Sequence, residues 1–293
     1  MKKILIVCAA VCLMISGCGK KEEHKAGFTV VTSFYPVYIL AKNIAKDIPS
    51  VEIRNMTPSI TGCLHDYSMT ADDMKHLEKA DLFLINGAGM ESFMEKTAKR
   101  FPSLKTAELS AGLPLIKDAE GNINPHVWVS VENMIGMAHT CADVLSAQDK
   151  THEADYRKNE KRYVDELSAL KAEMGREMKA FKGKKIVTFH EAFPYFAKEY
   201  GLVIAAVVER EPGSEPSAKE LSETVELVRS SGIKALFAEP QYPASAAETI
   251  ARETGSKVYV LDPAVTGDDS PGAYAAAMKK NLAVLKEALG SRQ

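Results

Sequence analysis

The stretch from His152 to Phe181, HEADYRKNEKRYVDELSALKAEMGREMKAF, decides the architecture of this chain. It contains no proline and a single glycine, Gly175, and its large apolar residues recur at steps of 7, 4, 3, 4, 4 and 3. These residues are Tyr156, Tyr163, Leu167, Leu170, Met174, Met178 and Phe181. The spacing predicts one continuous amphipathic helix, about 45 Å long for about 30 residues. A coiled-coil segment is the alternative, but a single helix of about four heptads favours a rigid connector between two lobes.

Strands and helices alternate on both sides of this helix. The expected strands are 28–33, 51–56 and 81–86 before it, and 185–189, 202–208, 233–238 and 257–261 after it. The expected helices are 35–46, 70–79 and 91–100, followed by 193–200, 217–230, 245–254 and 273–289. This alternation predicts parallel sheets with crossover helices. We therefore expect an α/β fold with an N-terminal lobe (27–150), the connecting helix (151–182) and a C-terminal lobe (183–293), each lobe built on a mainly parallel sheet.

The composition excludes several classes of protein. The chain has 293 residues, 46% of them hydrophobic, with 37 Lys and Arg against 39 Asp and Glu, for a net charge of −2. A binding protein for nucleic acid needs a basic face, which this balance does not favour. The hydrophobic content also excludes a disordered chain.

The first residues have the pattern of an export signal. Lys2 and Lys3 precede an apolar run, residues 4–15, which is shorter than the roughly 20 residues that span a bilayer. The run ends in Ile15-Ser16-Gly17-Cys18, which resembles a bacterial lipobox. We expect a signal peptide (1–17) and a tether (18–26) that a lipid on Cys18 anchors to the outer face of the cytoplasmic membrane. The alternative to a lipobox is an ordinary signal peptide that happens to be followed by a cysteine. The alternative to a membrane anchor is a periplasmic location.

Five residues are candidates for a metal site. His190, Glu239 and Asp262 each follow an expected strand of the second lobe directly, and ligands of open α/β sheets bind beyond the carboxyl ends of the strands. The first lobe adds His65 and His126, which lie in expected loops. Three imidazoles and a carboxylate suit Zn²⁺, with Mn²⁺ as the alternative. Each residue taken alone could equally be a surface histidine or a strand-end acid.

Two cysteines remain in the body of the protein. Cys63 and Cys141 could form a disulfide in an oxidising compartment, and the sequence does not decide this. Cys63 lies two residues before His65 and could also be a soft metal ligand, but without a CxxC pair the sequence favours this less.

A series of motifs identifies a family. In chain order they are Thr32-Ser33-Phe34-Tyr35-Pro36, His65-Asp66-Tyr67-Ser68-Met69-Thr70, Asn86-Gly87-Ala88-Gly89-Met90-Glu91, Asn124-Pro125-His126-Val127-Trp128, Thr188-Phe189-His190-Glu191-Ala192-Phe193, Pro212-Gly213-Ser214-Glu215-Pro216-Ser217, Phe237-Ala238-Glu239-Pro240-Gln241 and Leu261-Asp262-Pro263. Behind a lipobox they make the chain similar to the metal-binding lipoproteins of bacterial zinc/manganese ABC importers, the cluster A-I solute-binding proteins. The resemblance covers residues 28–289.

The resemblance implies a function and a set of ligands. A divalent metal would be held between two lobes by His65, His126, His190 and Asp262, with Glu239 as the alternative fourth ligand or as a residue that supports the ligands. A histidine at position 190 is similar to zinc-type members. A monomer would capture zinc and deliver it to the permease and ATPase of an importer.

Three alternatives to this function remain open. One is a manganese-specific member of the same family. Another is an exported zinc hydrolase, which would need an open coordination position and a general base. A role as an adhesin is the third. The absence of an HExxH or HxH pair weighs against the hydrolase.

Overall fold

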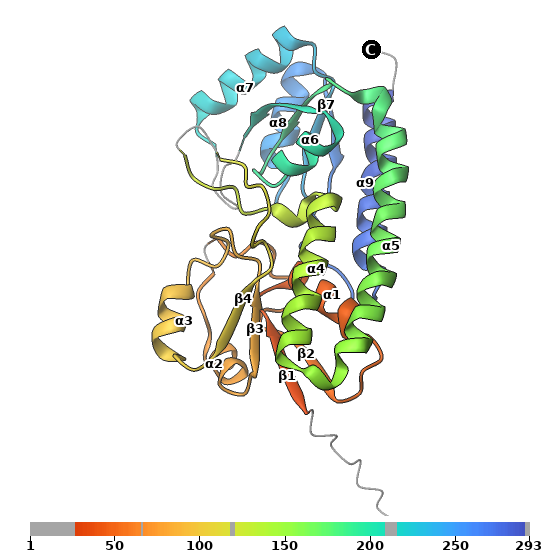
Figure 1. Ribbon diagram of the computed structural model, residues 1–293. Helices are drawn as coiled ribbons and strands as arrows, with labels where there is room; N and C mark the ends of the chain where they lie inside the picture. The colour runs from red at the N-terminus through yellow and green to blue at the C-terminus, as the bar shows by residue number, and fades with distance from the viewer. Residues whose placement is uncertain (1–26, 66, 118–120, 209–215, 291–293) are drawn as a thin grey trace, which may run out of the picture.

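The computed structural model describes residues 27–65, 67–117, 121–208 and 216–290. The predictions for the signal peptide, the tether and Cys18 lie outside these residues. Within them the chain forms two four-stranded parallel sheets, which lie along the same side of a long helix, one towards each of its ends (Figure 1). The predicted α/β class, with two lobes and a connecting helix, is confirmed.

The first sheet has the strand order β2-β1-β3-β4, and the second has the order β6-β5-β7-β8. The strands are β1 (Phe28–Thr32), β2 (Val51–Asn55), β3 (Leu82–Ile85), β4 (Lys105–Glu108), β5 (Lys185–Thr188), β6 (Val203–Val207), β7 (Ala235–Ala238) and β8 (Lys257–Val260). In both sheets the strand order reverses beside the first strand of the lobe. Such a reversal opens a crevice at the carboxyl ends of the strands, where ligands bind.

Helices cover these sheets and follow the expected ranges closely. They are α1 (Tyr35–Ile44), α2 (Ala71–Glu78), α3 (Met94–Arg100), α4 (Val131–Gln148), α5 (Glu153–Met178), α6 (Pro194–Tyr200), α7 (Ala218–Ser231), α8 (Ser245–Thr254) and α9 (Ala273–Gly290). Side-chain caps fix several helix starts, because Thr70, Ser130 and Ser217 each accept a hydrogen bond from a backbone N–H of the first turn. Residues 127–129, after Pro125 and His126, form a short 3₁₀ turn before α4 begins.

The long helix has the buried stripe that its sequence predicts. Six of the seven stripe residues are at most 3% exposed, and Phe181 lies in the 3₁₀ turn that follows α5. A feature that the sequence does not show is the position of α9, which runs alongside α5 and spans both lobes with it (Figure 1). The two parallel helices α5 and α9 therefore pack against both lobes, which restricts how far the lobes can move apart.

The segment after β8 makes further contacts between the two lobes. The indole N–H of Trp128 donates to the Pro263 carbonyl at 2.8 Å, and the Tyr274 hydroxyl donates to the Trp128 carbonyl at 2.8 Å. Further along, the Tyr35 hydroxyl donates to the Asp268 carbonyl at 2.8 Å. These bonds tie the end of the C-terminal lobe to α1 and η1 (Val127–Val129) of the N-terminal lobe. No helix among the described residues is long and apolar enough to cross a membrane.

Candidate metal centre

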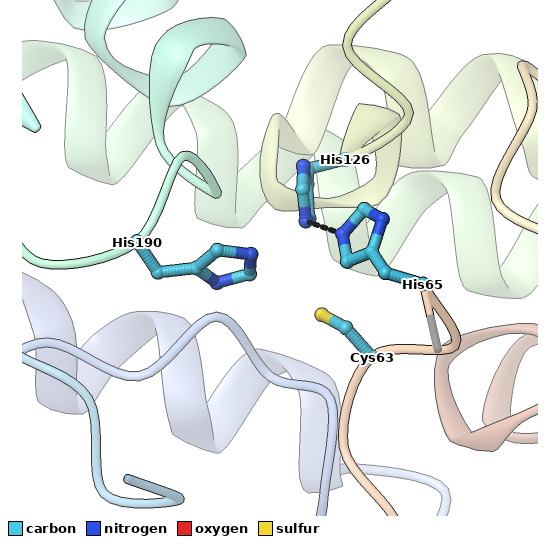
Figure 2. Close-up of side chains that lie close together, drawn as sticks. All are labelled: Cys63, His65, His126 and His190. Carbon is cyan, nitrogen blue, oxygen red and sulfur yellow. Dashed lines mark hydrogen bonds between the residues drawn. The ribbon is translucent and has the colours of Figure 1, made fainter. Parts of the chain in front are cut away.

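Four side chains converge between the two lobes. Cys63, His65, His126 and His190 each offer one ligand atom, and these four atoms all lie within 4.8 Å of one another (Figure 2). The three imidazole ring centres are 4.6 to 5.8 Å apart. The structure thus brings together the three predicted histidines, from loops 61 to 125 residues apart in the chain. It also brings in Cys63, which the sequence analysis favoured less as a metal ligand than the histidines.

Cys63 and His65 lie on the loop that follows β2. Gly62 has a φ of +84°, a left-handed conformation that L residues with a side chain rarely adopt, and it is buried. A Cβ atom at this position would lie 3.3 Å from the Tyr242 hydroxyl of the C-terminal lobe. Gly62 therefore allows the loop to turn against the second lobe and to point both Cys63 and His65 into the space between the lobes.

His126 is held by the turn that contains Pro125. The Asn124 side-chain oxygen accepts from the His126 backbone N–H at 3.0 Å and from Nδ1 at 3.1 Å, while the Asn124 amide N–H donates to the Glu191 carbonyl at 2.8 Å. Because the amide oxygen can only accept, Nδ1 carries the hydrogen and Nε2 has the free lone pair. His126 Nε2 lies 3.1 Å from His65 Nε2. A metal ion between these two nitrogens would replace that hydrogen bond.

His190 follows β5 and is supported by a buried acid. Its Nδ1 lies 3.0 and 3.2 Å from the two carboxylate oxygens of Glu239, which follows β7. The two side chains are 3% and 1% exposed. The remaining ring nitrogen, Nε2, is buried and has no hydrogen-bond partner among the described residues. A buried polar atom without a partner is costly, and a metal ion would remove that cost.

The electrostatics of the cluster favour a neutral imidazole at His126. Burial lowers the pKa of His126 well below its ordinary value, and the neighbouring His190 and His65 lower it further. Burial raises the pKa of Glu239, while the contact with His190 opposes this shift and Asp262 adds to it. Neutral His126 is in the form that binds a metal at pH 7 without releasing a proton.

Asp262 lies apart from the four clustered ligand atoms. It is half-buried beyond β8, where its Oδ1 accepts from the Gln241 side-chain amide at 3.2 Å and from the Ala264 backbone N–H at 2.9 Å. Ala264 has a φ of +56°, so Asp262 stabilises a tight turn in its own loop. The prediction that Asp262 binds the metal stays a prediction, and Glu239 contacts His190 rather than the space between the ring nitrogens.

Comparison with known proteins agrees with this geometry. The sequence model of the ZnuA family, described as zinc-uptake complex component A, periplasmic, matches residues 30–288. The chain belongs to this family. ZnuA-family proteins are extracytoplasmic metal-binding components of ABC importers, and they are solute-binding proteins rather than enzymes. The exported hydrolase considered from the sequence is therefore wrong.

Individual ZnuA-family relatives span nearly all of this chain. The zinc-binding lipoprotein AdcA of Streptococcus pneumoniae is 30% identical across 98% of the chain, which spans 61% of the length of AdcA. The high-affinity zinc uptake system protein ZnuA of Bacillus subtilis is 29% identical, with 97% of both proteins covered. The structure of FpvC from Pseudomonas aeruginosa, solved in complex with Mn²⁺, superposes with a TM-score of 0.81 at 30% identity, covering 90% of this chain and 98% of FpvC.

Cys63 is the clustered residue that sequence reasoning undervalued. Its side chain is brought to the histidines by the turn at Gly62, and its spacing from His65 matches no familiar ligand motif. The signal that could have found it is proximity, since a cysteine two residues before a proposed ligand lies on the same short loop. Cys63 and Cys141 are not joined by a disulfide, and Cys141 is buried in α4.

Proposed function

We propose that this protein captures a zinc ion between its lobes and delivers it to the permease of an ABC importer. The observation that carries the proposal is the buried, partnerless Nε2 of His190 beside the Nε2 atoms of His65 and His126. Imidazole suits zinc better than manganese, which prefers carboxylate, carbonyl and water oxygens. AdcA and ZnuA carry zinc in their names, whereas FpvC was solved with Mn²⁺, and the imidazole donors of this chain favour zinc.

The residues around the imidazoles prepare them for binding. Asn124 fixes the tautomer of His126, and Glu239 holds Nδ1 of His190, so that both rings present Nε2 to the ion. Supporting contacts of this kind orient metal ligands and raise their basicity. For a fourth ligand the sequence offers Asp262, with Glu239 as its alternative. The contact between Glu239 and His190 favours a supporting role for Glu239.

Delivery follows from the arrangement of the lobes. The long helix α5 and its neighbour α9 restrict lobe movement, so we expect small changes on binding and release driven by contact with the permease. We also propose that the chain is exported, cleaved before Cys18 and held at the membrane by a lipid on that cysteine, as a monomer. We further propose that the chain after the tether is organised in three units, 27–150, 151–182 and 183–293.

A competitive titration with zinc and manganese tests this function. We expect one zinc per chain, bound more tightly than manganese, and a large loss of zinc affinity in His126→Ala. His139→Ala is the matched control, because His139 is exposed and pairs with Glu160 away from the cluster. Asp262→Ala measures the role of the acid independently. Absence of stoichiometric metal, or unchanged affinity in His126→Ala, would contradict the proposal.

A further inference from the structure

We propose that the thiolate of Cys63 is a metal ligand and completes, with the three histidines, a site that selects zinc and other thiophilic ions over manganese. This inference rests on the proposed metal-capture function and concerns the fourth ligand of the same site. Neither the sequence resemblance nor the proposed function assigns a ligand role to Cys63.

The spacing of the four ligand atoms is close to that of a zinc site. In tetrahedral zinc sites with bonds of about 2.0–2.1 Å to nitrogen and about 2.3 Å to sulfur, neighbouring ligand atoms lie about 3.4 to 3.6 Å apart. The two nitrogens of His65 and His126 are already 3.1 Å apart, and all four ligand atoms, including the Cys63 sulfur, lie within 4.8 Å. The widest separation would close by about 1.2 to 1.4 Å, and the His65–His126 pair would widen by about 0.3 Å, to reach tetrahedral spacing. Movements of this size are ordinary side-chain adjustments.

The Cys63 side chain points towards the histidines. Figure 2 shows the Cys63 sulfur directed into the space that the rings of His65 and His190 enclose. The partnerless Nε2 of His190 lies in the same buried space, and this independent observation indicates that the space takes an ion. Cys63 enters from the N-terminal lobe and His190 from the C-terminal lobe. A single ion bound by both would therefore join the lobes.

Asp262, the alternative fourth ligand, lies in another environment. Asp262 Oδ1 is engaged by Gln241 and by the Ala264 N–H, and its carboxylate lies outside the group of four ligand atoms. Recruiting Oδ1 would break the turn that Asp262 stabilises, and recruiting Oδ2 would bring a carboxylate in from outside the group of four. Because the Cys63 sulfur already lies in the group, we assign Cys63 the fourth position and leave Asp262 as a nearby negative charge.

A thiolate changes which metals the site accepts. Soft sulfur ligands favour zinc and other thiophilic ions, while manganese prefers oxygen ligands. A set of three imidazoles and one thiolate is a closed structural-type zinc site with no position left for water. We therefore expect Cys63 to contribute strongly to zinc affinity and little to manganese affinity.

The test combines cobalt spectroscopy with metal titration in the full chain. The variants are Cys63→Ala, Cys63→Ser and, as the matched control, Cys141→Ala, which removes the other described cysteine from the core of α4. Cobalt-loaded wild-type protein and Cys141→Ala should show a sulfur-to-cobalt charge-transfer band in the near ultraviolet, and both Cys63 variants should lack it. Loss of a supporting residue weakens metal binding about 10- to 100-fold, so loss of this ligand should weaken zinc binding about 100-fold or more, with manganese binding changed less than about threefold.

The outcomes separate this inference from the proposed function. If wild-type protein binds one zinc but its cobalt form lacks the band, or if Cys63→Ala keeps full zinc affinity, Cys63 is not a ligand and the metal-capture function stands. If wild-type protein binds no metal, the function itself fails. A measurement that needs no variant is alkylation of Cys63 followed by peptide mass mapping. Zinc should slow the reaction at Cys63 strongly, and an unchanged rate at saturating zinc would overturn the inference.

Discussion

Glu239 should control metal affinity without controlling the fold. Its carboxylate contacts Nδ1 of His190 at 3.0 and 3.2 Å, and neither side chain is more than 3% exposed. Removal of the carboxylate in Glu239→Ala frees the ring to rotate and withdraws the charge that makes Nε2 a stronger donor. Supporting contacts of this kind contribute about 10- to 100-fold to metal affinity. This corresponds to about 1.4 to 2.7 kcal/mol at one tenfold per 1.4 kcal/mol.

The two substitutions of Glu239 should differ. Glu239→Gln keeps an oxygen that accepts from Nδ1 but loses the charge, so we expect it near the tenfold end of the range and Glu239→Ala near the hundredfold end. Burial raises the pKa of Glu239, so burial disfavours the charged carboxylate, although the contact with His190 offsets part of that cost. Metal-free Glu239→Gln should consequently unfold at the same temperature as the wild type or at a higher one.

The assay is competition for zinc against a chelating dye, beside thermal unfolding of the metal-free protein. Glu199→Gln is the matched control, because burial also raises the pKa of Glu199 but its carboxylate interacts with Ser130 and Tyr200 instead of a histidine. It should leave zinc affinity within about twofold of the wild type. Zinc affinity within threefold of the wild type in Glu239→Ala, with the fold intact, would refute the reasoning.

Two further predictions concern pH and the contacts between the lobes. Because burial holds the pKa of His126 below its unfolded value of about 6.5, the unfolded chain gains a proton there that the folded chain does not. The stability of the metal-free protein should therefore fall as pH drops below about 6.5. In thermal melts made with a chelator present, His126→Asn should show a smaller dependence of stability on pH, and an equal dependence in both proteins would contradict this. Gly267→Ala should destabilise the protein by about 1–3 kcal/mol, since a Cβ there would lie 2.2 Å from the Tyr35 hydroxyl oxygen, whereas Gly272→Ala, with nothing within 4 Å, serves as the control in chemical denaturation.

The fold could be predicted largely because its signals are periodic and local. The apolar stripe of α5 has a 3.6-residue period, and the buried strands are short apolar runs, so each element is encoded in its own residues. β4 was not predicted because Lys-Thr-Ala-Glu has no apolar run and lies at the edge of its sheet, where pairing with β3 is enough to form a strand. The packing of α9 along α5 was also missed, because the apolar stripe on a helix does not indicate which element packs against it.

The candidate site could be predicted in part for a different reason. The rule that ligands gather at strand ends finds His190, Glu239 and Asp262 together, but it does not say which way each side chain turns. Backbone details decide that question. Asp262 turns to the Ala264 N–H, Glu239 turns to His190, and the left-handed Gly62 turns Cys63 towards the histidines. The direction in which each of these side chains turns cannot be predicted from the spacing of residues in the sequence.

The distribution of the clustered residues between the lobes bears on how the metal is released. Cys63, His65 and His126 come from the N-terminal lobe, and among the four clustered residues only His190 comes from the C-terminal lobe. The lobes are tied together at Trp128, at Tyr35 and along α5, and the Asn124 amide also donates to the Glu191 carbonyl in the loop that carries His190. A wide hinge opening would break all of these contacts, whereas a local shift of the loop after β5 would withdraw His190 and break the Asn124 bond. We therefore expect the N-terminal lobe to keep three of the four proposed ligands in place, so that release needs the loss of one imidazole rather than the separation of two domains.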